Sequence, residues 1–177
     1  MKNIFFITGA SGVGKTSLVD SLKEKYGSRN SWVFLHFDSI GVPSPEEMIK
    51  QFGSGENWQK EMTYQWIKIL LNEYQDKNVI IFEGQVNLKF IRDGFSQYNF
   101  SNYEIILIDC DEDTMGKRLT HDRNQPELLN DDMKNWLKYL RNQANTFGVN
   151  IIETSSINKI AVMKEFEKIL NKRINLL

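Results

Sequence analysis

The sequence predicts an α/β fold, a three-layer sandwich in which helices cover both faces of a five-stranded parallel sheet. Five short apolar stretches recur along the chain, and a helical pattern separates each stretch from the next. This alternation is typical of parallel strands joined by right-handed crossover connections. Polar residues also follow the strands directly, and a glycine-rich segment separates the first strand from the first helix. Because ligands of open parallel sheets bind beyond the carboxyl ends of the strands, these segments predict a site at that edge.

Each predicted strand is a short and mostly apolar run bounded by polar residues or glycine. In chain order these runs lie at about 3–8, 32–37, 78–82, 103–108 and 149–152. Continuous apolar runs are typical of parallel strands that are covered on both faces. The sheet is therefore expected to lie inside the protein.

The segments between the strands carry apolar residues at spacings of three and four, which is typical of helices with one buried face. They are expected from the glycine-rich segment to about 26, and then at about 45–49, 56–74, 88–95, 111–119, 130–147 and 157–170. Ser44, Asn130 and Ser156 are predicted N-caps, and Gly27 and Gly148 are predicted to end their helices. The aromatic and methionine stripe of the 56–74 helix is expected to be core.

Composition limits the classes of protein that fit. The 177 residues suit one domain, and a formal net charge of −1 provides no overall attraction to nucleic acid or to an anionic membrane. Cys110 is the one cysteine, so no internal disulfide can form, which suits a reducing cytoplasm. No stretch approaches the ~20 apolar residues of a membrane span. We therefore expect a cytoplasmic protein without nucleic-acid or membrane partners, either a monomer or a homodimer.

The glycine-rich segment Gly9–Thr16 reads G-x-x-x-x-G-K-T and lies between a predicted strand and a predicted helix. Its glycines allow a tight turn whose backbone N–H groups can hold phosphate oxygens, at the positive end of the new helix. Lys15 can reach the β- and γ-phosphates, and the Thr16 hydroxyl can ligate Mg²⁺. This segment resembles that of the P-loop nucleoside triphosphate-binding proteins. The resemblance implies nucleotide contacts at Gly9, Ala10, Ser11, Gly12, Val13, Gly14, Lys15, Thr16 and Ser17.

Other P-loop classes match less well. A Ras-like GTPase would carry N-K-x-D near the fifth strand, but the nearest match, 158–161, reads N-K-I-A. A transporter-type or AAA-type ATPase would need a longer chain. The layout resembles the nucleoside and nucleotide kinase-like group over essentially the whole chain, as one domain spanning 1–177. The resemblance implies an ATP- and Mg²⁺-dependent phosphotransferase, with an acceptor-binding excursion at about 39–55 and a short lid at about 118–127.

The resemblance also assigns roles to three residues at strand ends. Asp38 is expected to orient or deprotonate the acceptor hydroxyl; the alternative is a turn cap beside Ser39. Glu83 is expected to hold Mg²⁺ with Thr16 and to face the substrate; the alternative is a surface carboxylate. Gln85 can hydrogen-bond the acceptor or serve as an ordinary amide at a helix start.

Two arginines of the lid segment, Arg118 and Arg123, are expected to act on the transferring phosphoryl group, since a guanidinium matches phosphate oxygens and neutralises their charge. Arg141, on the next helix, is either a further substrate contact or a surface residue. His36 is predicted to be a satisfied core histidine. His121 has no second metal ligand at a useful spacing, so zinc is not expected there, and Cys110 is assigned no role.

The sequence does not decide whether the acceptor is a nucleoside, a nucleotide or another small hydroxyl compound, because the chain lacks the acceptor-binding motifs of guanylate and adenylate kinases. No arginine-rich guanylate-binding segment follows the first helix, and 83–87 reads E-G-Q-V-N where an adenylate kinase would carry D-G-F-P-R. These departures support a rival hypothesis, a nucleotide-binding regulator that acts through a protein partner with little or no kinase activity. The choice between ATP and GTP as donor also stays open.

Overall fold

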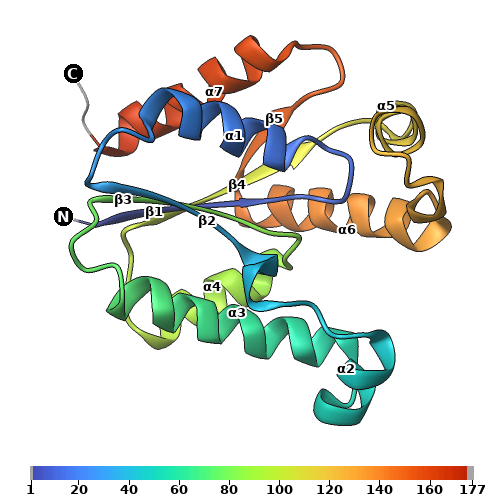
Figure 1. The fold of residues 1–177 in the computed structure, drawn as a ribbon, viewed down its shortest axis with the longest axis horizontal. Helices are drawn as coiled ribbons and strands as arrows, with labels where there is room; N and C mark the ends of the chain where they lie inside the picture. The colour runs from blue at the N-terminus through green and yellow to red at the C-terminus, as the bar shows by residue number, and fades with distance from the viewer. Residues whose placement is uncertain (1, 175–177) are drawn as a thin grey trace.

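The fold is organised around one parallel sheet, shown in Figure 1 for the computed structural model, which describes residues 2–174. Its strand order is β2-β3-β1-β4-β5. The strands are β1 (Asn3–Thr8), β2 (Trp32–His36), β3 (Val79–Glu83), β4 (Tyr103–Asp109) and β5 (Asn150–Glu153). The predicted fold class is confirmed, and each predicted strand agrees with the observed one to within one residue at either end.

Helices cover both faces of this sheet. They are α1 (Lys15–Tyr26), α2 (Pro45–Phe52), α3 (Gly55–Asn72), α4 (Leu88–Gln97), α5 (Glu112–Lys117), α6 (Asp131–Phe147) and α7 (Lys159–Ile174). Helices α1 and α7 lie on one face, and α3, α4 and α6 lie on the other (Figure 1). Within residues 2–174, no helix combines the length and the apolar composition that crossing a membrane requires.

The sequence of β1 explains the three layers. Successive side chains of a strand point to opposite faces of the sheet, and those of β1 are apolar on both. Phe5 and Ile7 pack in the core under α1 and α7, whereas Ile4 and Phe6 pack in the core under α3 and α4. All four are fully buried, and each large apolar side chain buried in this way contributes about 1.5–3 kcal/mol.

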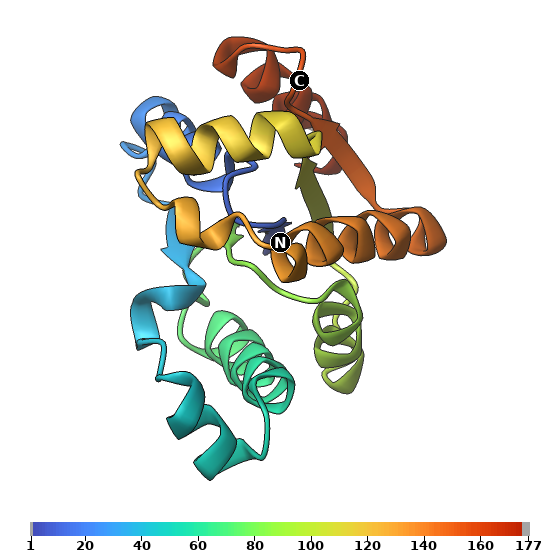
Figure 2. The same ribbon diagram turned by 90° about the vertical axis from the view of Figure 1, so that its right-hand side faces the viewer.

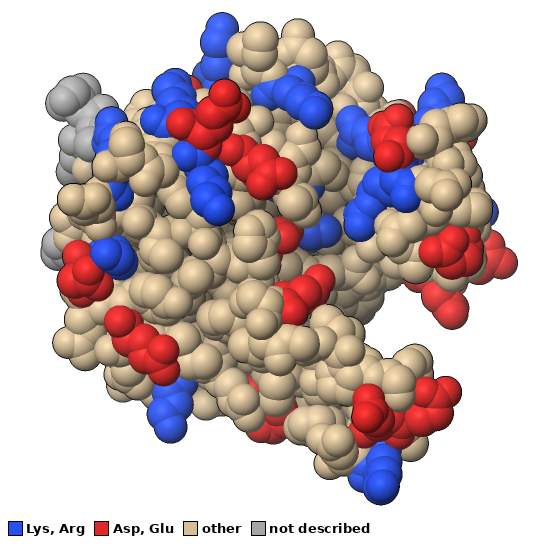
Figure 3. Space-filling view, viewed as in Figure 1, with Lys and Arg blue, Asp and Glu red and all other residues tan. Residues whose placement is uncertain are grey.

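The carboxyl ends of the strands meet at one edge, and β1 lies there between β3 and β4, which the chain reaches on opposite sides. This arrangement is the topological switch point at which open α/β sheets bind ligands. Figure 2 looks onto this edge, with α5 on one side of it and α2 on the other. The space-filling view shows the molecule hollowed between the lobe that carries α5 and the lobe that carries α2 (Figure 3).

Two irregular segments flank that edge. Directly after β2, a 3₁₀ turn spans Phe37–Ile40. After α5 the helix continues as a π-helical turn over Arg118–Asp122, in which the Arg123 N–H donates to the Arg118 carbonyl. The predicted α-helix at 111–119 therefore ends earlier than expected. Short π-helical turns often mark functional sites.

The predicted start of the last helix was wrong. Ser156 does not cap it; the Asn158 side chain accepts the Ala161 N–H at 3.0 Å instead. The Glu153 carboxylate accepts the Ser155 N–H at 2.8 Å and the Ser156 hydroxyl at 3.3 Å, which keeps these residues in a loop. Ile160, an apolar residue of the helix predicted at 157–170, is 69% exposed.

Candidate active site

The glycine-rich loop, Gly9–Thr16, wraps tightly between β1 and α1. Gly12 and Gly14 have φ angles of 80° and 104°, a left-handed region in which residues with a Cβ are strained. Gly9 lies so close to β4 that a Cβ there would be 2.4 Å from the Ile108 carbonyl oxygen. The loop thus has the backbone geometry of a phosphate cradle, and it is packed firmly against the central strands.

The first turn of α1 differs from those of the other helices. Each of α2 to α6 has a side chain that accepts an N–H of its first turn, and Asn158 does so for α7. At α1 the N-cap is Gly14, no side chain caps the helix, and no acidic residue lies in the first turn. The positive end of this helix therefore faces the loop without a protein anion to balance it, which favours a bound phosphate.

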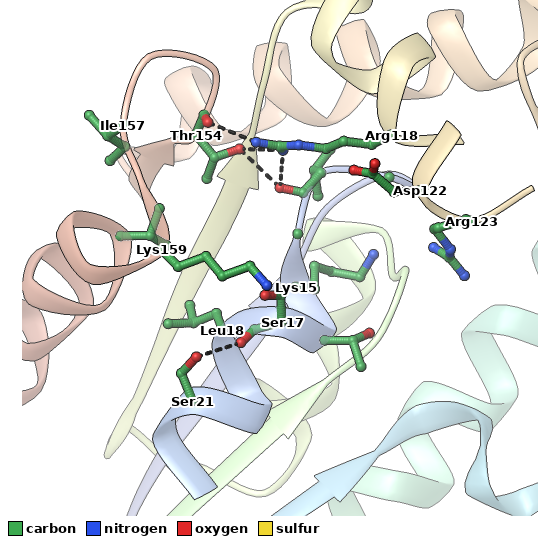
Figure 4. Close-up of a pocket in the computed structure, with 15 residues that line it drawn as sticks. Lys15, Ser17, Leu18, Ser21, Arg118, Asp122, Arg123, Thr154, Ile157 and Lys159 are labelled. Atoms are coloured by element: carbon green, nitrogen blue, oxygen red, sulfur yellow. Dashed lines mark hydrogen bonds between the residues drawn. The ribbon is translucent and has the colours of Figure 1, made fainter. Parts of the chain in front are cut away.

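Lys15 is the centre of the predicted catalytic group. Its ammonium donates to the Ala10 carbonyl of the same loop at 2.9 Å. Burial lowers the pKa of Lys15 to about 8, with Arg123 acting in the same direction and the carboxylates of Glu83 and Asp38 opposing it. The structure therefore brings four of the predicted residues within electrostatic reach of one another. Lys15 and Arg123 point into the same space in front of the loop (Figure 4).

Asp38 lies on the 3₁₀ turn after β2, and its side chain is exposed. Within residues 2–174 its carboxylate has no hydrogen bond or ion pair; the turn is closed by the Gly41 N–H, which donates to the backbone carbonyl of Asp38. The alternative role as a side-chain turn cap is therefore not what the structure shows. The carboxylate remains available to a ligand at the edge of the sheet.

Glu83 ends β3 and is nearly buried. One of its oxygens lies 2.9 Å from His36 Nδ1, which the pairing of β2 with β3 places opposite it. His36 is satisfied as predicted, but it is not a core residue, because 37% of its side chain is exposed. Sequence reasoning missed this partnership, although the strand-end positions of both residues could have indicated it. His36 orients the Glu83 carboxylate.

The two predicted lid arginines have different environments. Arg118 donates to the Val13 carbonyl at 3.0 Å and to the hydroxyl and carbonyl of Thr154 at 2.9 Å each. It joins the loop to the end of β5, as the dashed lines of Figure 4 show. Arg123 has no hydrogen bond from its side chain within the described residues. Arg118 is held by the protein itself, whereas Arg123 is free to contact a ligand.

A pocket of about 400 Å³ opens in front of the loop. Its lining comprises Gly12 to Leu18, Ser21, Arg118, Asp122, Arg123, Thr154, Ile157, Lys159 and Val162. Lys159 reaches into it from the start of α7 (Figure 4). Neither Thr154 nor Lys159 was predicted as a site residue, and only their place after the fifth strand pointed to this pocket. We call it the donor pocket.

A second pocket of about 570 Å³ lies beside the loop, between α3, the segment after β3 and α6. Its lining comprises Gly55, Glu56, Gln59, Gln85, Asn87, Asp132, Asn135, Trp136 and Tyr139. Ser11 of the loop donates to the Gln85 side-chain oxygen at 2.9 Å, so the predicted Gln85 connects this pocket to the P-loop. We call this second pocket the acceptor pocket, after the contact with an acceptor that the sequence predicts for Gln85.

Arg141 lines neither pocket. Its guanidinium donates to both carboxylate oxygens of buried Asp109, at 2.5 and 3.0 Å, and to the Cys110 carbonyl at 2.9 Å. The hydrogen bond to Asp109 raises the pKa of Arg141 above its ordinary value. The structure thus places Arg141 as an anchor of α6 on β4 and does not bring it to the other predicted residues. Its contact with substrate stays a prediction.

Cys110 and His121 were the two residues to which the sequence assigned no role and no metal. Burial raises the pKa of the Cys110 thiol to about 11, so the thiol stays protonated near neutral pH. Within residues 2–174, no group of three or more His, Cys, Asp or Glu side chains is placed to hold a metal ion. Thr16 and Glu83 by themselves are too few ligands, and a cation there would need phosphate oxygens and water as well.

Comparisons with known proteins agree with this geometry. A family model described as an AAA domain matches residues 5–153. The argument from length against an AAA-type domain was therefore wrong, because this family model fits within the chain. A search of curated proteins finds no match to the chain.

Three solved structures have similar folds. A gluconokinase from Sinorhizobium meliloti 1021 has a TM-score of 0.65 and 14% identity, over 98% of this chain and 95% of its own. An uncharacterized protein from Eubacterium ventriosum ATCC 27560 has a TM-score of 0.59 and 15% identity, over 97% and 100%. Shikimate kinase from Acinetobacter baumannii, in complex with shikimate, has a TM-score of 0.53 and 20% identity, over 99% and 94%. The predicted likeness to P-loop kinases is confirmed at the level of the fold.

Proposed function

Because this chain belongs to the AAA-domain family of P-loop proteins, we propose that it is a kinase that transfers the γ-phosphoryl group of Mg·ATP to a hydroxyl group of a small molecule. One observation carries the proposal: Lys15 lies within electrostatic reach of Arg123, Asp38 and Glu83, at the mouth of the P-loop. A nucleotide-binding protein that only signals has no need of a free carboxylate and a free guanidinium beside the outermost phosphate. The similar structures include two kinases, which supports the same class of reaction.

The residues present fit a nucleoside triphosphate. The loop offers backbone N–H groups, and α1 offers an uncapped positive end. Lys15 offers an ammonium group, whose pKa is lowered to about 8 by burial. Phosphate oxygens would restore the charged form of Lys15, since an opposite charge nearby favours it. The triphosphate would thus meet donors that are already in place, so that little reorganisation is needed for binding.

The fit to Mg²⁺ is narrower. The Thr16 hydroxyl and the Glu83 carboxylate would hold the ion, directly or through water, with the remaining positions left to phosphate and water. When bound, the ion would neutralise charge on the phosphate oxygens during transfer. His36 keeps the Glu83 carboxylate in place from the neighbouring strand.

The protein's own contribution to the reaction is positioning and charge. The Asp38 carboxylate is free to accept the proton of the acceptor hydroxyl as this oxygen attacks the γ-phosphorus. Arg123 lies on the segment after α5 and would neutralise the equatorial oxygens of the transferring group. Arg118 would shape the pocket by holding Val13 and Thr154 together, and Lys159 would add a cation on the side of α7.

A screen of acceptors tests this proposal. Nucleosides, nucleoside monophosphates, sugars, sugar acids, amino sugars and amino alcohols would be added to the purified protein with Mg·ATP or Mg·GTP, and nucleoside diphosphate release would be measured. At least one acceptor is expected to raise release far above the rate with water alone, and EDTA is expected to abolish it. We place this reaction in the cytoplasm, where a single unpaired cysteine stays reduced.

Two outcomes would contradict the proposal. Failure to bind either Mg·ATP or Mg·GTP would remove the nucleotide site itself. Tight binding with slow hydrolysis, no stimulation by any acceptor, and nucleotide-dependent binding of a protein partner would favour the regulator.

A further inference from the structure

We propose that the acceptor pocket selects an amine-bearing polyhydroxy compound, such as an amino sugar or an aminocyclitol, accepts the uncharged analogue more weakly and rejects anions. This inference rests on the proposed kinase function and assigns the substrate class of the same site. The pocket between α3 and α6 is lined by amides, aromatic rings and carboxylates, and no cation is among its lining residues.

The acceptor pocket is one hydrogen bond away from the P-loop. Ser11 Oγ donates to Gln85 Oε1 at 2.9 Å, and Gln59 Nε2 donates to the Gln85 carbonyl at 3.0 Å. The side-chain nitrogen of Gln85 has no partner within residues 2–174, so both of its N–H donors can serve a ligand. A hydroxyl compound held against Gln85 would therefore lie beside the loop that holds the phosphates.

The inner wall of the pocket is a chain of uncharged groups. Gln59 Oε1 accepts the Asn87 N–H at 3.0 Å. The side-chain nitrogens of Asn87 and Gln143 both donate to the Tyr139 hydroxyl oxygen, at 3.0 and 2.9 Å. With both acceptor positions of that oxygen used, the hydroxyl proton of Tyr139 is left to donate, and no acceptor for it exists within the described residues. Amide and phenol groups fixed in this way recognise hydroxyl groups by hydrogen bonding and supply no countercharge.

The outer wall is aromatic. The rings of Trp136 and Tyr139 stack with their centroids 5.5 Å apart and an angle of 24° between their planes. Both residues line the pocket. An aromatic face of this kind can cover the apolar C–H face of a sugar or cyclitol ring, and it attracts a cation above it.

The charges of the lining are all negative. Glu56 in the first turn of α3 and Asp132 in the first turn of α6 line the pocket, and neither forms an ion pair within residues 2–174. No lysine, arginine or histidine is among the lining residues. Four cations of α4 and α6 have carboxylate partners outside the lining: Arg141 with Asp109, Lys89 with Asp93, Lys134 with Asp131 and Lys138 with Glu112. An ammonium group would find countercharge here, whereas a carboxylate or phosphate would lose water and gain repulsion.

The acceptor screen described above provides the first test, with kcat/KM determined for matched acceptors. An amine-bearing compound, its neutral analogue and its carboxylate analogue would be compared, for instance glucosamine, glucose and glucuronate together with the corresponding cyclitols. The expected order is amine, then neutral, then carboxylate, with a difference of about tenfold between amine and neutral. A sugar acid or a nucleoside monophosphate as the best acceptor would overturn the inference and leave the kinase intact. Tight Mg·ATP binding without transfer to any member would instead overturn the proposed function, and the inference with it.

A pair of double variants tests the charges directly. Glu56→Gln with Asp132→Asn removes both carboxylates of the lining. Glu61→Gln with Asp20→Asn makes the same chemical changes on α3 and α1, at exposed positions that line neither pocket and form no ion pair within residues 2–174. The first variant is expected to reduce the amine-to-neutral ratio of kcat/KM by about three- to tenfold, and the second is expected to leave the ratio unchanged. The KM for Mg·ATP should be unchanged in both. An unaltered ratio in the first variant would show that these carboxylates do not select the acceptor.

Discussion

The donor pocket and the acceptor pocket open at the same edge of the sheet, but their chemistry is opposite. The donor pocket is lined by backbone of a glycine-rich loop and by the cations Lys15, Arg118, Arg123 and Lys159. The acceptor pocket is lined by amides, two aromatic rings and the carboxylates of Glu56 and Asp132. One hydrogen bond, from Ser11 of the P-loop to Gln85, connects the acceptor pocket to the loop that lines the donor pocket. A triphosphate would be favoured on one side of that bond and disfavoured on the other.

The difference extends to how each pocket is held. At the donor pocket the uncapped start of α1 leaves its N–H groups for a ligand, and Arg118 fixes the loop to β5. At the acceptor pocket the helices are capped: Ser54 caps α3, Asn87 caps α4 and Asn130 caps α6. The donor pocket thus keeps uncapped backbone donors, whereas the helices around the acceptor pocket have capped first turns and would contact a ligand mainly through side chains. Substitutions on the two sides should therefore affect different kinetic constants.

The largest effect is expected from Lys15→Ala. Loss of this ammonium removes the full charge that the P-loop places beside the transferring phosphoryl group, and kcat/KM should fall by at least about 10³-fold. Nucleotide binding, measured by calorimetry, should also weaken. Lys23→Ala, an exposed substitution on the same helix, is the matched control and should retain activity. A Lys15→Ala enzyme with wild-type turnover would show that the donor pocket does not carry the chemistry.

Asp38→Asn should reduce phosphoryl transfer without affecting nucleotide binding. The amide keeps the shape of the carboxylate but cannot take the acceptor proton, so kcat should fall by about 10²- to 10⁴-fold. Binding of Mg·ATP should be unchanged, since Asp38 is not among the residues that line the donor pocket. Asp20→Asn, an exposed carboxylate of α1, provides the control. Full activity of Asp38→Asn would eliminate the proposed proton acceptor.

The two lid arginines should fail in different ways. Arg123→Ala removes a guanidinium that has no partner within residues 2–174, so kcat should fall by about 10²-fold or more with little change in stability. Arg118→Ala removes hydrogen bonds to Val13 and Thr154, and should lower the free energy of unfolding by about 1–3 kcal/mol. Urea denaturation and steady-state kinetics would distinguish these outcomes. Equal loss of stability in both variants would contradict the difference.

The pH dependence of nucleotide affinity should be specific to the donor pocket. Burial lowers the pKa of Lys15 to about 8 in the free protein, and phosphate oxygens would raise it again in the complex. Affinity is therefore fully present below pH 8 and falls at higher pH, by up to about tenfold per unit, because binding must then take up a proton. The contribution of Lys15 to the free energy of unfolding has the opposite trend and rises with pH. The reason is that the unfolded state keeps the Lys15 proton to a higher pH than the folded state does.

Calorimetry of Mg·ATP binding at pH 9, in two buffers with different ionisation enthalpies, would measure this proton uptake. Lys15→Ala should abolish the uptake, although its binding is weaker. Affinity that stays constant between pH 7 and pH 9.5 in the wild-type protein would contradict the lowered pKa. The affinity of the acceptor pocket for an uncharged acceptor should not change with pH as Lys15 loses its proton.

The sequence predicted the sheet and the donor pocket because both depend on local patterns. Apolar runs predict the strands, and the motif from Gly9 to Thr16 by itself predicts a phosphate-binding loop. The start of α7 was misjudged because Ser156 is bound by Glu153, a competition that spacing does not reveal. His36 was misjudged because its partner Glu83 is far along the chain and is reached only through the pairing of two strands.

The acceptor pocket could not be predicted for the same reason. Gln59 lies on α3, Asn87 caps α4 and Tyr139 lies on α6, so the three are far apart in sequence, and each is an ordinary polar residue in its own segment. They form one side of the pocket only through hydrogen bonds to one another, and these bonds require the packed tertiary structure. Trp136 belongs to the apolar pattern of α6, and it packs on the core as well as lining the pocket.

The smallest expected effect comes from Tyr139→Phe, which removes one hydroxyl of the acceptor pocket and keeps the stacked ring. The side chains of Asn87 and Gln143 lose a shared acceptor, and the free energy of unfolding should fall by about 0.5–1.5 kcal/mol. Because Tyr139 would donate to a hydroxyl of the acceptor, the KM for that acceptor should rise by about three- to tenfold. The KM for Mg·ATP should be unchanged, as no donor-pocket residue contacts this hydroxyl. If Tyr139→Phe raised the KM for Mg·ATP instead, the two pockets would not be the separate binding surfaces that their opposite chemistry indicates.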